Sequence, residues 1–367
     1  MTLPEFLEGE CAALPKSRPG NVDFPDYLSL IFTDFITGLQ AVTGTDQLTS
    51  TVLQNVATVQ SIADSIVQIV REYYAGSPGQ AFDLLSQMLG QQSQHFGKLY
   101  TIPLKPEDLS NLYRLRVADA GEFGREQMFH IPFELRHKVA TQRYSIPGFP
   151  SLYLGSSAYI CWKELRCPQF DDVYSARLEA KSTVRVLNLG YRPRAVGWYA
   201  RVQIQSGTNN QQLLEFLLAQ VMFWPLLTAA SVRVLHPDAP FKPEYIVPQL
   251  VLQFVREDRT NNIDGIRYFS LHLDQPTVSV STELRLGSNF VFPVKTPAAV
   301  GLCALLRQQF AMTPVFPWQL VGRIHLPGTG GAPNDNIELV RGCPCSYIHT
   351  IFGEIEAMSL AMQASPI

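Results

Sequence analysis

Charge is scarce in this sequence of 367 residues. Only 17% of the residues are charged, and 29 basic side chains against 32 acidic ones leave a formal net charge of -3 at pH 7. Because binding to a polyphosphate needs clustered lysine and arginine, we do not expect nucleic acid as the main partner. An anionic small molecule would instead have to be bound by individual arginines.

Cysteine is also scarce, and the sequence lacks long apolar runs. Six cysteines at irregular spacing do not make a disulfide framework, which favours a reducing, cytoplasmic setting. Residues 1–10 lack the basic and apolar regions of a secretory signal. The nearest candidate for a membrane span, residues 213–230, is interrupted by Glu215, Gln220 and Pro225, so we expect no membrane association.

The sequence offers little for a metal ion. Cys343 and Cys345 are a close pair with His349 nearby, but zinc ligands usually stand about two to four residues apart and no second pair follows. Asp171 and Asp172 indicate a solvated turn. We therefore predict no metal site.

The N-terminal part of the chain has a helical pattern. Between residues 24 and 94, apolar side chains recur at spacings of three and four, most regularly over residues 52–73. The turn at residues 76–79 stops one helix and starts the next. Prolines at 103 and 106 then mark a linker, so we place a helical module at residues 1–102.

The remainder, residues 103–367, mixes strands and helices without regular alternation. We therefore predict an α+β fold, in which a mixed sheet is packed by helices and follows the N-terminal helical module. The expected strands are residues 112–117, 173–180, 184–189 and 265–270, and the expected helices are 211–229, 243–257, 298–310 and 348–362.

Residues 143–164 hold the most informative pattern. Arg143 precedes a turn rich in proline and glycine, which excludes a helix and reverses the chain. A short strand then carries Tyr153, a serine at 156–157 can cap a helix, and Glu164 lies about two turns inside that helix. Without further context, Arg143 and Glu164 would form a structural ion pair and Tyr153 would be core.

This segment resembles the core of the RES domain family, which is named for its arginine, glutamate and serine. Two further blocks match in order. Residues 111–116, with Arg114, are similar to the family's opening strand. Residues 245–250 and 264–270 are similar to its late helix and to the strand that carries its serine, here Ser270.

The resemblance spans about residues 110–300. The sequence departs from the usual family form in length, with extra chain between Arg114 and Arg143, a longer stretch between Glu164 and Ser270, and added segments at both ends. These departures bear on substrate access and regulation more than on the core.

The resemblance implies a core like that of ADP-ribosyltransferases, acting on NAD as a substrate with no separate cofactor. Arg114 and Arg143 would bind the pyrophosphate through planar guanidinium groups. Tyr153 would stack on the cationic nicotinamide ring, and Ser270 would bond the ribose or a phosphate. Glu164 would stabilise the positive charge that grows on the ribose as nicotinamide leaves. The expected catalytic residues are therefore Glu164, Arg143 and Tyr153.

Three functions stay open at this point. The first is cleavage of nicotinamide from NAD, with water or phosphate as acceptor. The second is transfer of ADP-ribose to a protein, and the third is a catalytically silent interaction module. The family's toxins act in bacteria and are often restrained by an antitoxin or immunity protein, and here the N-terminal helices would replace or recruit that partner. A homo-oligomer is also left open.

Overall fold

The computed structural model divides into two compact units, which are interleaved along the chain. The helical unit comprises residues 1–102, 141–146 and 187–261, and the sheet unit comprises residues 103–140, 147–186 and 262–367. The described residues are 1–92, 101–109, 111–118, 123–206, 211–258, 262–273, 279–321, 335–340 and 343–367.

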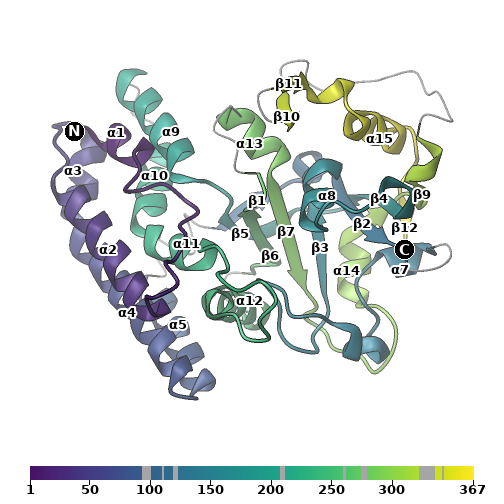
Figure 1. Ribbon diagram of the computed structural model, residues 1–367, viewed down its shortest axis with the longest axis horizontal. Helices are drawn as coiled ribbons and strands as arrows, with labels where there is room; N and C mark the ends of the chain where they lie inside the picture. Colours follow the sequence, from purple (N-terminus) through teal and green to yellow (C-terminus); the bar gives the residue numbers. More distant parts are fainter. Residues whose placement is uncertain are drawn as a thin grey trace. The chain divides into compact units, whose positions relative to one another are not determined.

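The helical unit begins with a series of helices (Figure 1), and the longer ones bury one apolar face each. On the longest of them, Val59, Ile62 and Ile66 are buried at the three- and four-residue spacing that the sequence predicted. The helices of the first segment are α1 (Leu3–Glu8), α2 (Phe24–Gln40), α3 (Gln47–Gln54), α4 (Val56–Tyr74) and α5 (Pro78–Gln91). The later helices are α9 (Pro193–Ser206), α10 (Gln211–Met222), α11 (Trp224–Ser231), the 3-10 turn η5 (Pro243–Tyr245) and α12 (Ile246–Glu257).

Asn55 separates α3 from α4, although the apolar spacing runs on across it. Its side-chain amide donates to the carbonyl of Thr51 at 2.8 Å, which competes with the helix for that acceptor. Past α4, Gly76 takes the left-handed conformation (φ +83°) that ends the helix, and Pro78 occupies the first turn of α5 as predicted.

The single helix predicted at residues 211–229 is two helices. Pro225 has no amide hydrogen, so it fits the first turn of a new helix, and α10 and α11 meet at 54°. Trp224 stacks on Phe35 of α2 with ring centroids 3.7 Å apart, which fixes α11 in the core of its unit. In the described part of the chain, no single helix is long and apolar enough to cross a membrane, and only the bent pair α10 and α11 would reach that length together.

The sheet unit is built on a curled mixed sheet, so the chain has the predicted α+β fold. Three strands have the bounds that the sequence predicted, namely β2 (Leu112–Val117), β4 (Val173–Ala180) and β5 (Val184–Leu189). The described strands follow the order β1 (Thr101–Leu104), β5 (Val184–Leu189), β6 (Gly265–Phe269), β7 (Ser288–Pro293), β3 (Ser151–Gly155), β2 (Leu112–Val117), β4 (Val173–Ala180), β8 (Phe310–Met312) and β12 (Ser365–Pro366), and β9 (Phe316–Pro317) also pairs with β4. Strands β1 and β5 each run across a boundary between the units.

Short helices accompany this sheet, and one of them packs into an aromatic cluster. Trp162 of α8 stacks on Phe170 at 5.6 Å, and Phe352 of α15 meets Tyr159 edge-on at 5.0 Å. Tyr159, Phe352 and Trp318 belong to one buried core, and the partly buried Trp162 and Phe170 pack against it. The described helices of the sheet unit are α7 (Arg125–Met128), α8 (Ala158–Glu164), α13 (Val280–Leu286), α14 (Ala304–Gln309) and α15 (Ile351–Leu360), with 3-10 turns at Pro106–Leu109, Phe133–Lys138, Phe170–Asp172, Trp318–Leu320 and Tyr347–His349.

Candidate functional site

The strand β3 and the helix α8 form the support of the predicted site, as the sequence indicated. Ser157 caps α8, because its hydroxyl oxygen accepts from the amide of Ile160 at 3.1 Å. The same hydroxyl donates to the carbonyl of Leu286 at 2.8 Å, which ties the helix start to α13. At Gly155 the strand passes so close to the helix that an added Cβ would lie 2.5 Å from the sulfur of Cys161. The approach of strand and helix therefore requires glycine.

Glu164 is the last residue of α8 and stands at the centre of a polar cluster. Its Oε1 accepts two hydrogen bonds of 2.6 Å, one from the hydroxyl of Ser270 and one from the side-chain amide of Asn289. Both donors are buried, whereas 36% of the Glu164 side chain is exposed. The Glu164 carboxylate is thus held by buried donors on one side and is partly exposed to solvent on the other.

The second carboxylate oxygen faces a different group. Oε2 lies 3.8 Å from Nε2 of His272, a side chain that is half exposed. The backbone amide of His272 donates to the Ser270 hydroxyl oxygen at 3.1 Å, and the same hydroxyl donates a hydrogen bond to Oε1 of Glu164. This chain orients Oε1 and leaves Oε2 as the oxygen available to a ligand.

Tyr153 lies on the same face of the sheet as Asn289. Across the antiparallel pair of β3 and β7, Tyr153 stands opposite Val291 and Gly155 stands opposite Asn289. On this face of the sheet, the pair that contains Tyr153 is next to the pair that contains Asn289, so Tyr153 lies beside the polar cluster. Burial raises the pKa of its phenol well above the ordinary value.

Arg114 occupies the place where β2 and β3 separate. These strands pair only at Tyr113 and Gly155, and Nη1 of Arg114 donates to the carbonyl of Tyr153 at 2.7 Å. Strand alternation puts Arg114 and Arg116 together on the face opposite Tyr113. Because Tyr113 pairs with Gly155, this is also the face opposite Tyr153 and Asn289. Burial and the neighbouring Arg116 lower the pKa of Arg114 to about 9, so the group stays charged at neutral pH. No acidic side chain in the described part of the chain pairs with either arginine.

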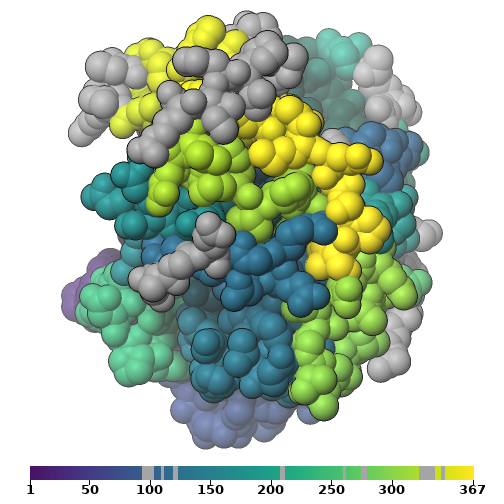
Figure 2. Space-filling model, turned by 90° about the vertical axis from the view of Figure 1, so that its right-hand side faces the viewer, coloured from purple at the N-terminus to yellow at the C-terminus, as the bar shows by residue number. Residues whose placement is uncertain are grey.

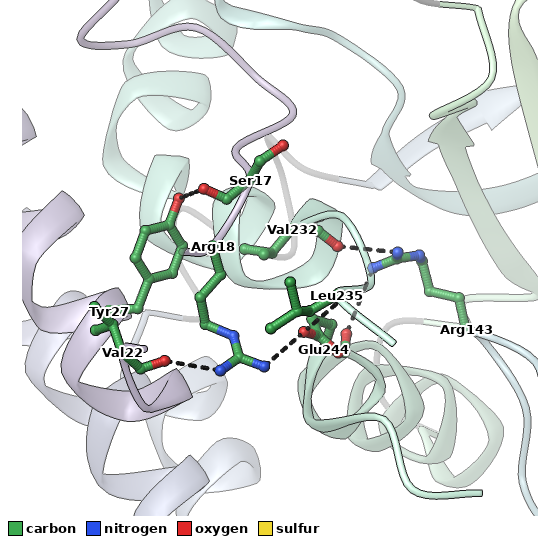
Figure 3. Close-up of polar contacts among 8 residues, drawn as sticks. All are labelled: Ser17, Arg18, Val22, Tyr27, Arg143, Val232, Leu235 and Glu244. Atoms are coloured by element: carbon green, nitrogen blue, oxygen red, sulfur yellow. Dashed lines mark hydrogen bonds and ion pairs between the residues drawn. The ribbon is translucent and has the colours of Figure 1, made fainter. Parts of the chain in front are cut away.

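Arg143 belongs to the helical unit, and Figure 3 shows its hydrogen bond to the carbonyl of Val232. It donates to the carbonyls of Ala230 at 3.1 Å and Val232 at 3.0 Å, and it lies over the ring of Tyr245. These carbonyls end α11, so the cation satisfies acceptors that a helix end leaves open. A joint role of Arg143 with Glu164 stays a prediction.

The structure therefore brings Glu164 and Ser270 together, and it joins Arg114 to the backbone of Tyr153. Sequence reasoning missed Asn289 and His272. The available signal for Asn289 was an asparagine directly before the apolar run at 290–292, because asparagine is disfavoured in strands. His272 stands two residues after Ser270, and nothing in the local pattern marks it as part of a site.

The fold and the site together define an α+β protein with a carboxylate held at the end of a short helix by a hydroxyl and an amide. No protein family model matches the chain, and no solved structure matches it. Among curated proteins, the chain is similar to a Bacillus subtilis (strain 168) protein named "Putative toxin YopC". The two are 28% identical over an alignment of 364 residues, and the match covers 96% of this chain and 79% of that protein.

Proposed function

We propose that this chain is a toxin enzyme that cleaves the bond between nicotinamide and ribose in NAD, with water or phosphate as the acceptor. The observation that carries the proposal is the state of Glu164. One oxygen accepts from Ser270 and Asn289, and the other belongs to a partly exposed carboxylate beside His272. A structural ion pair would instead set this carboxylate against a buried cation.

The chemistry of NAD cleavage fits a site with one carboxylate. The electrons of the C–N bond leave with nicotinamide, which departs as a neutral molecule and needs no proton from an acid. Positive charge grows on the ribose, and the Oε2 atom of Glu164 would stabilise it. The acceptor then bonds to the ribose carbon, and a water molecule would lose its proton in this step.

Arg114 stays a proposed ligand for the pyrophosphate, and the pairing of β2 with β3 sets it on the sheet face opposite Tyr153 and Asn289. It is a half-buried cation without an acidic partner in the described part of the chain, and Arg116 lies on the same face. A pyrophosphate would relieve the repulsion between these two cations. Tyr153 remains the proposed platform for nicotinamide, Arg143 a proposed pyrophosphate ligand, and Ser270 a proposed contact to ribose in addition to its bond with Glu164.

The toxin role is supported by the similarity to a protein named as a toxin. Loss of NAD would arrest a cell, so a toxin of this kind would need restraint by an antitoxin or immunity protein. We propose that the helical module at residues 1–102 supplies or recruits that restraint, in a cytoplasmic setting.

The test is incubation of the purified chain with NAD and chromatography of the products. We expect free nicotinamide from the wild type and a loss on the order of 100-fold in Glu164→Gln, which keeps the size of the side chain but removes its charge. Glu126→Gln is the matched control, since Glu126 is exposed on α7 outside the cluster. The partner product, ADP-ribose or its phosphate, identifies the acceptor.

Two alternatives give different products. A protein ADP-ribosyltransferase would release nicotinamide and leave ADP-ribose on a protein, which mass spectrometry detects. A catalytically silent module would release none. Folded wild type that forms no nicotinamide in a partner-free state would contradict the proposed activity.

A further inference from the structure

A carboxylate from the C-terminal helix α15 meets the first turn of α8. Oε1 of Glu356 accepts from the backbone amide of Ala158 at 2.7 Å and from the hydroxyl of Tyr347 at 2.5 Å. The first amides of a helix have no partner within the helix. Ser157 satisfies the amide of Ile160, and Glu356 satisfies that of Ala158.

The C-terminal segment that carries Glu356 is itself firmly attached within the sheet unit. Arg177 of β4 donates to the carbonyls of Ser359 and Met362, both at 3.1 Å. Arg125 donates to the carbonyl of Ser365 at 2.8 Å, and Figure 2 shows the yellow C-terminal segment along the surface beside blue residues. Helix α15 is therefore a fixed point against which α8 can be held.

Glu356 is enclosed by the elements that surround the start of α8. Tyr113 of β2 and Cys161 of α8 lie close enough for the negative charge of Glu356 to raise their pKa values. Tyr347 donates a hydrogen bond to it directly. No basic side chain in the described part of the chain pairs with it. Glu356 is half-buried, and a carboxylate that loses water without gaining a cation is costly, so its two donors must be well placed for it to be retained.

We propose that Glu356, together with Tyr347, is a positioning residue that sets the register of α8 and thereby the place of the Glu164 carboxylate. This inference rests on the proposed function. Ala158 and Glu164 are the first and last residues of α8, about 9 Å apart along its axis. Over so short a helix, a shift at one end is carried to the other.

The required accuracy at Glu164 is high. Its two hydrogen bonds of 2.6 Å are short, so a displacement of about 0.5 Å would weaken both. Ser157 alone would leave α8 with one anchor at its start. Glu356 gives it a second anchor, contributed by a segment about 200 residues later in the sequence.

The test compares four variants of the full chain. Glu356→Ala removes the acceptor, Glu356→Gln keeps a carbonyl oxygen in its place, and Tyr347→Phe removes one donor with little change in packing. Glu354→Ala, on the same helix, is the matched control, because its side chain makes no hydrogen bond in the described structure. Each variant is measured by hydrogen exchange at the amides of residues 158–164 and by the kcat and KM of nicotinamide release.

We expect Glu356→Ala to speed exchange in α8 by about tenfold or more and to lower kcat by a similar factor with little change in KM. Tyr347→Phe should show smaller shifts in the same direction. Glu356→Gln should restore kcat to within about threefold of the wild type. The control variant Glu354→Ala should show the hydrogen exchange and the kinetic constants of the wild type.

The inference is overturned if Glu356→Ala and Tyr347→Phe leave both the exchange of α8 and kcat at wild-type values. It is also overturned if kcat per folded molecule falls equally in Glu356→Ala and Glu356→Gln, because positioning by an acceptor predicts rescue. A wild type without NAD turnover refutes the proposed function instead, and the exchange data still decide whether Glu356 holds α8.

Discussion

At the residue scale, the two oxygens of Glu164 have different surroundings. Oε1 is occupied by Ser270 and Asn289, and Oε2 faces the exposed side of the cluster near His272. Ser270, expected as a ligand for ribose or phosphate, donates its hydroxyl hydrogen bond to Glu164. Its first effect is therefore on the orientation of the carboxylate.

Ser270→Ala should lower kcat about tenfold and leave the KM for NAD within about twofold. The variant loses a hydrogen bond to a charged acceptor, which contributes about 1.5–3 kcal/mol, while the groups that would grip the dinucleotide remain. Steady-state kinetics of nicotinamide release measures both constants. Ser281→Ala, at an exposed serine on α13, is the control. A change in KM alone would show that Ser270 acts as a binding group.

The environment of His130 predicts that the free energy of unfolding decreases in acid. The ring is buried, its Nε2 accepts from the amide of Cys303 at 2.8 Å, and burial with the nearby Arg114 and Arg116 lowers its pKa to about 4. As the pH is lowered, His130 takes up a proton near pH 6.5 in the unfolded chain but only near pH 4 in the folded chain. The free energy of unfolding should therefore decrease as the pH is lowered from about 6.5 to about 4.

Urea unfolding at pH 7 and pH 5 measures this effect. The loss of stability between these two values should be smaller in His130→Gln than in the wild type. His236→Gln, at an exposed histidine, should keep the wild-type loss. Equal losses in all three proteins would remove His130 as the cause.

At the element scale, local sequence patterns located most elements, and tertiary contacts set the breaks. The branched residues of β4 and β5 predicted both strands to the residue. By contrast, apolar spacing runs across Asn55, and only the bond of its side chain to Thr51 shows why α3 ends there. The predicted helix at 348–362 starts later, at Ile351, because Thr350 caps it.

For Glu356 of α15 we expect the reverse of the His130 effect: its contribution to the free energy of unfolding should decrease as the pH rises. Burial raises the pKa of its carboxyl from 4.5 to about 7, so the folded state favours the protonated form. This stability is fully present below about pH 4.5 and is lost as the pH rises to about 7. Glu356→Gln carries no charge and should not lose stability by this route.

Unfolding midpoints at pH 5 and pH 8 give the comparison. Relative to the wild type, Glu356→Gln should gain stability at pH 8 and show little gain at pH 5. A gain of the same size at both values would mean that the carboxyl does not titrate in this range.

At the scale of the whole molecule, the chain enters the helical unit in three segments. The linker prolines after residue 102 could be read from composition. The return at residues 187–261 could not, because the same mixture of helix and strand signals would suit either unit. The site shows the same limit: Asn289 lies 125 residues from Glu164, and only the folded sheet brings it there.

A buried ion pair joins two of these segments in the helical unit (Figure 3). Arg18 lies 3.2 Å from Glu244, which is 1% exposed, and it also donates to the carbonyl of Val22 at 2.8 Å. Arg18→Met leaves a buried carboxylate without its cation and should lower the free energy of unfolding by about 3–5 kcal/mol. Arg71→Met breaks an exposed pair with Asp26 and should cost about 1 kcal/mol or less.

Denaturant unfolding followed by circular dichroism tests the pair. The Arg18 variant should unfold at a clearly lower denaturant concentration than the Arg71 variant. Similar midpoints for the two would show that the link between the segments is carried by apolar packing alone.

The most direct test of the account is the single-turnover rate of nicotinamide release, with enzyme in excess over NAD, for wild type and Glu164→Gln. We predict a rate lower by about 100-fold or more in the variant, with NAD affinity within about threefold, since the carboxylate acts on charge that exists only in the transition state. Equal single-turnover rates in the two proteins would contradict the central claim.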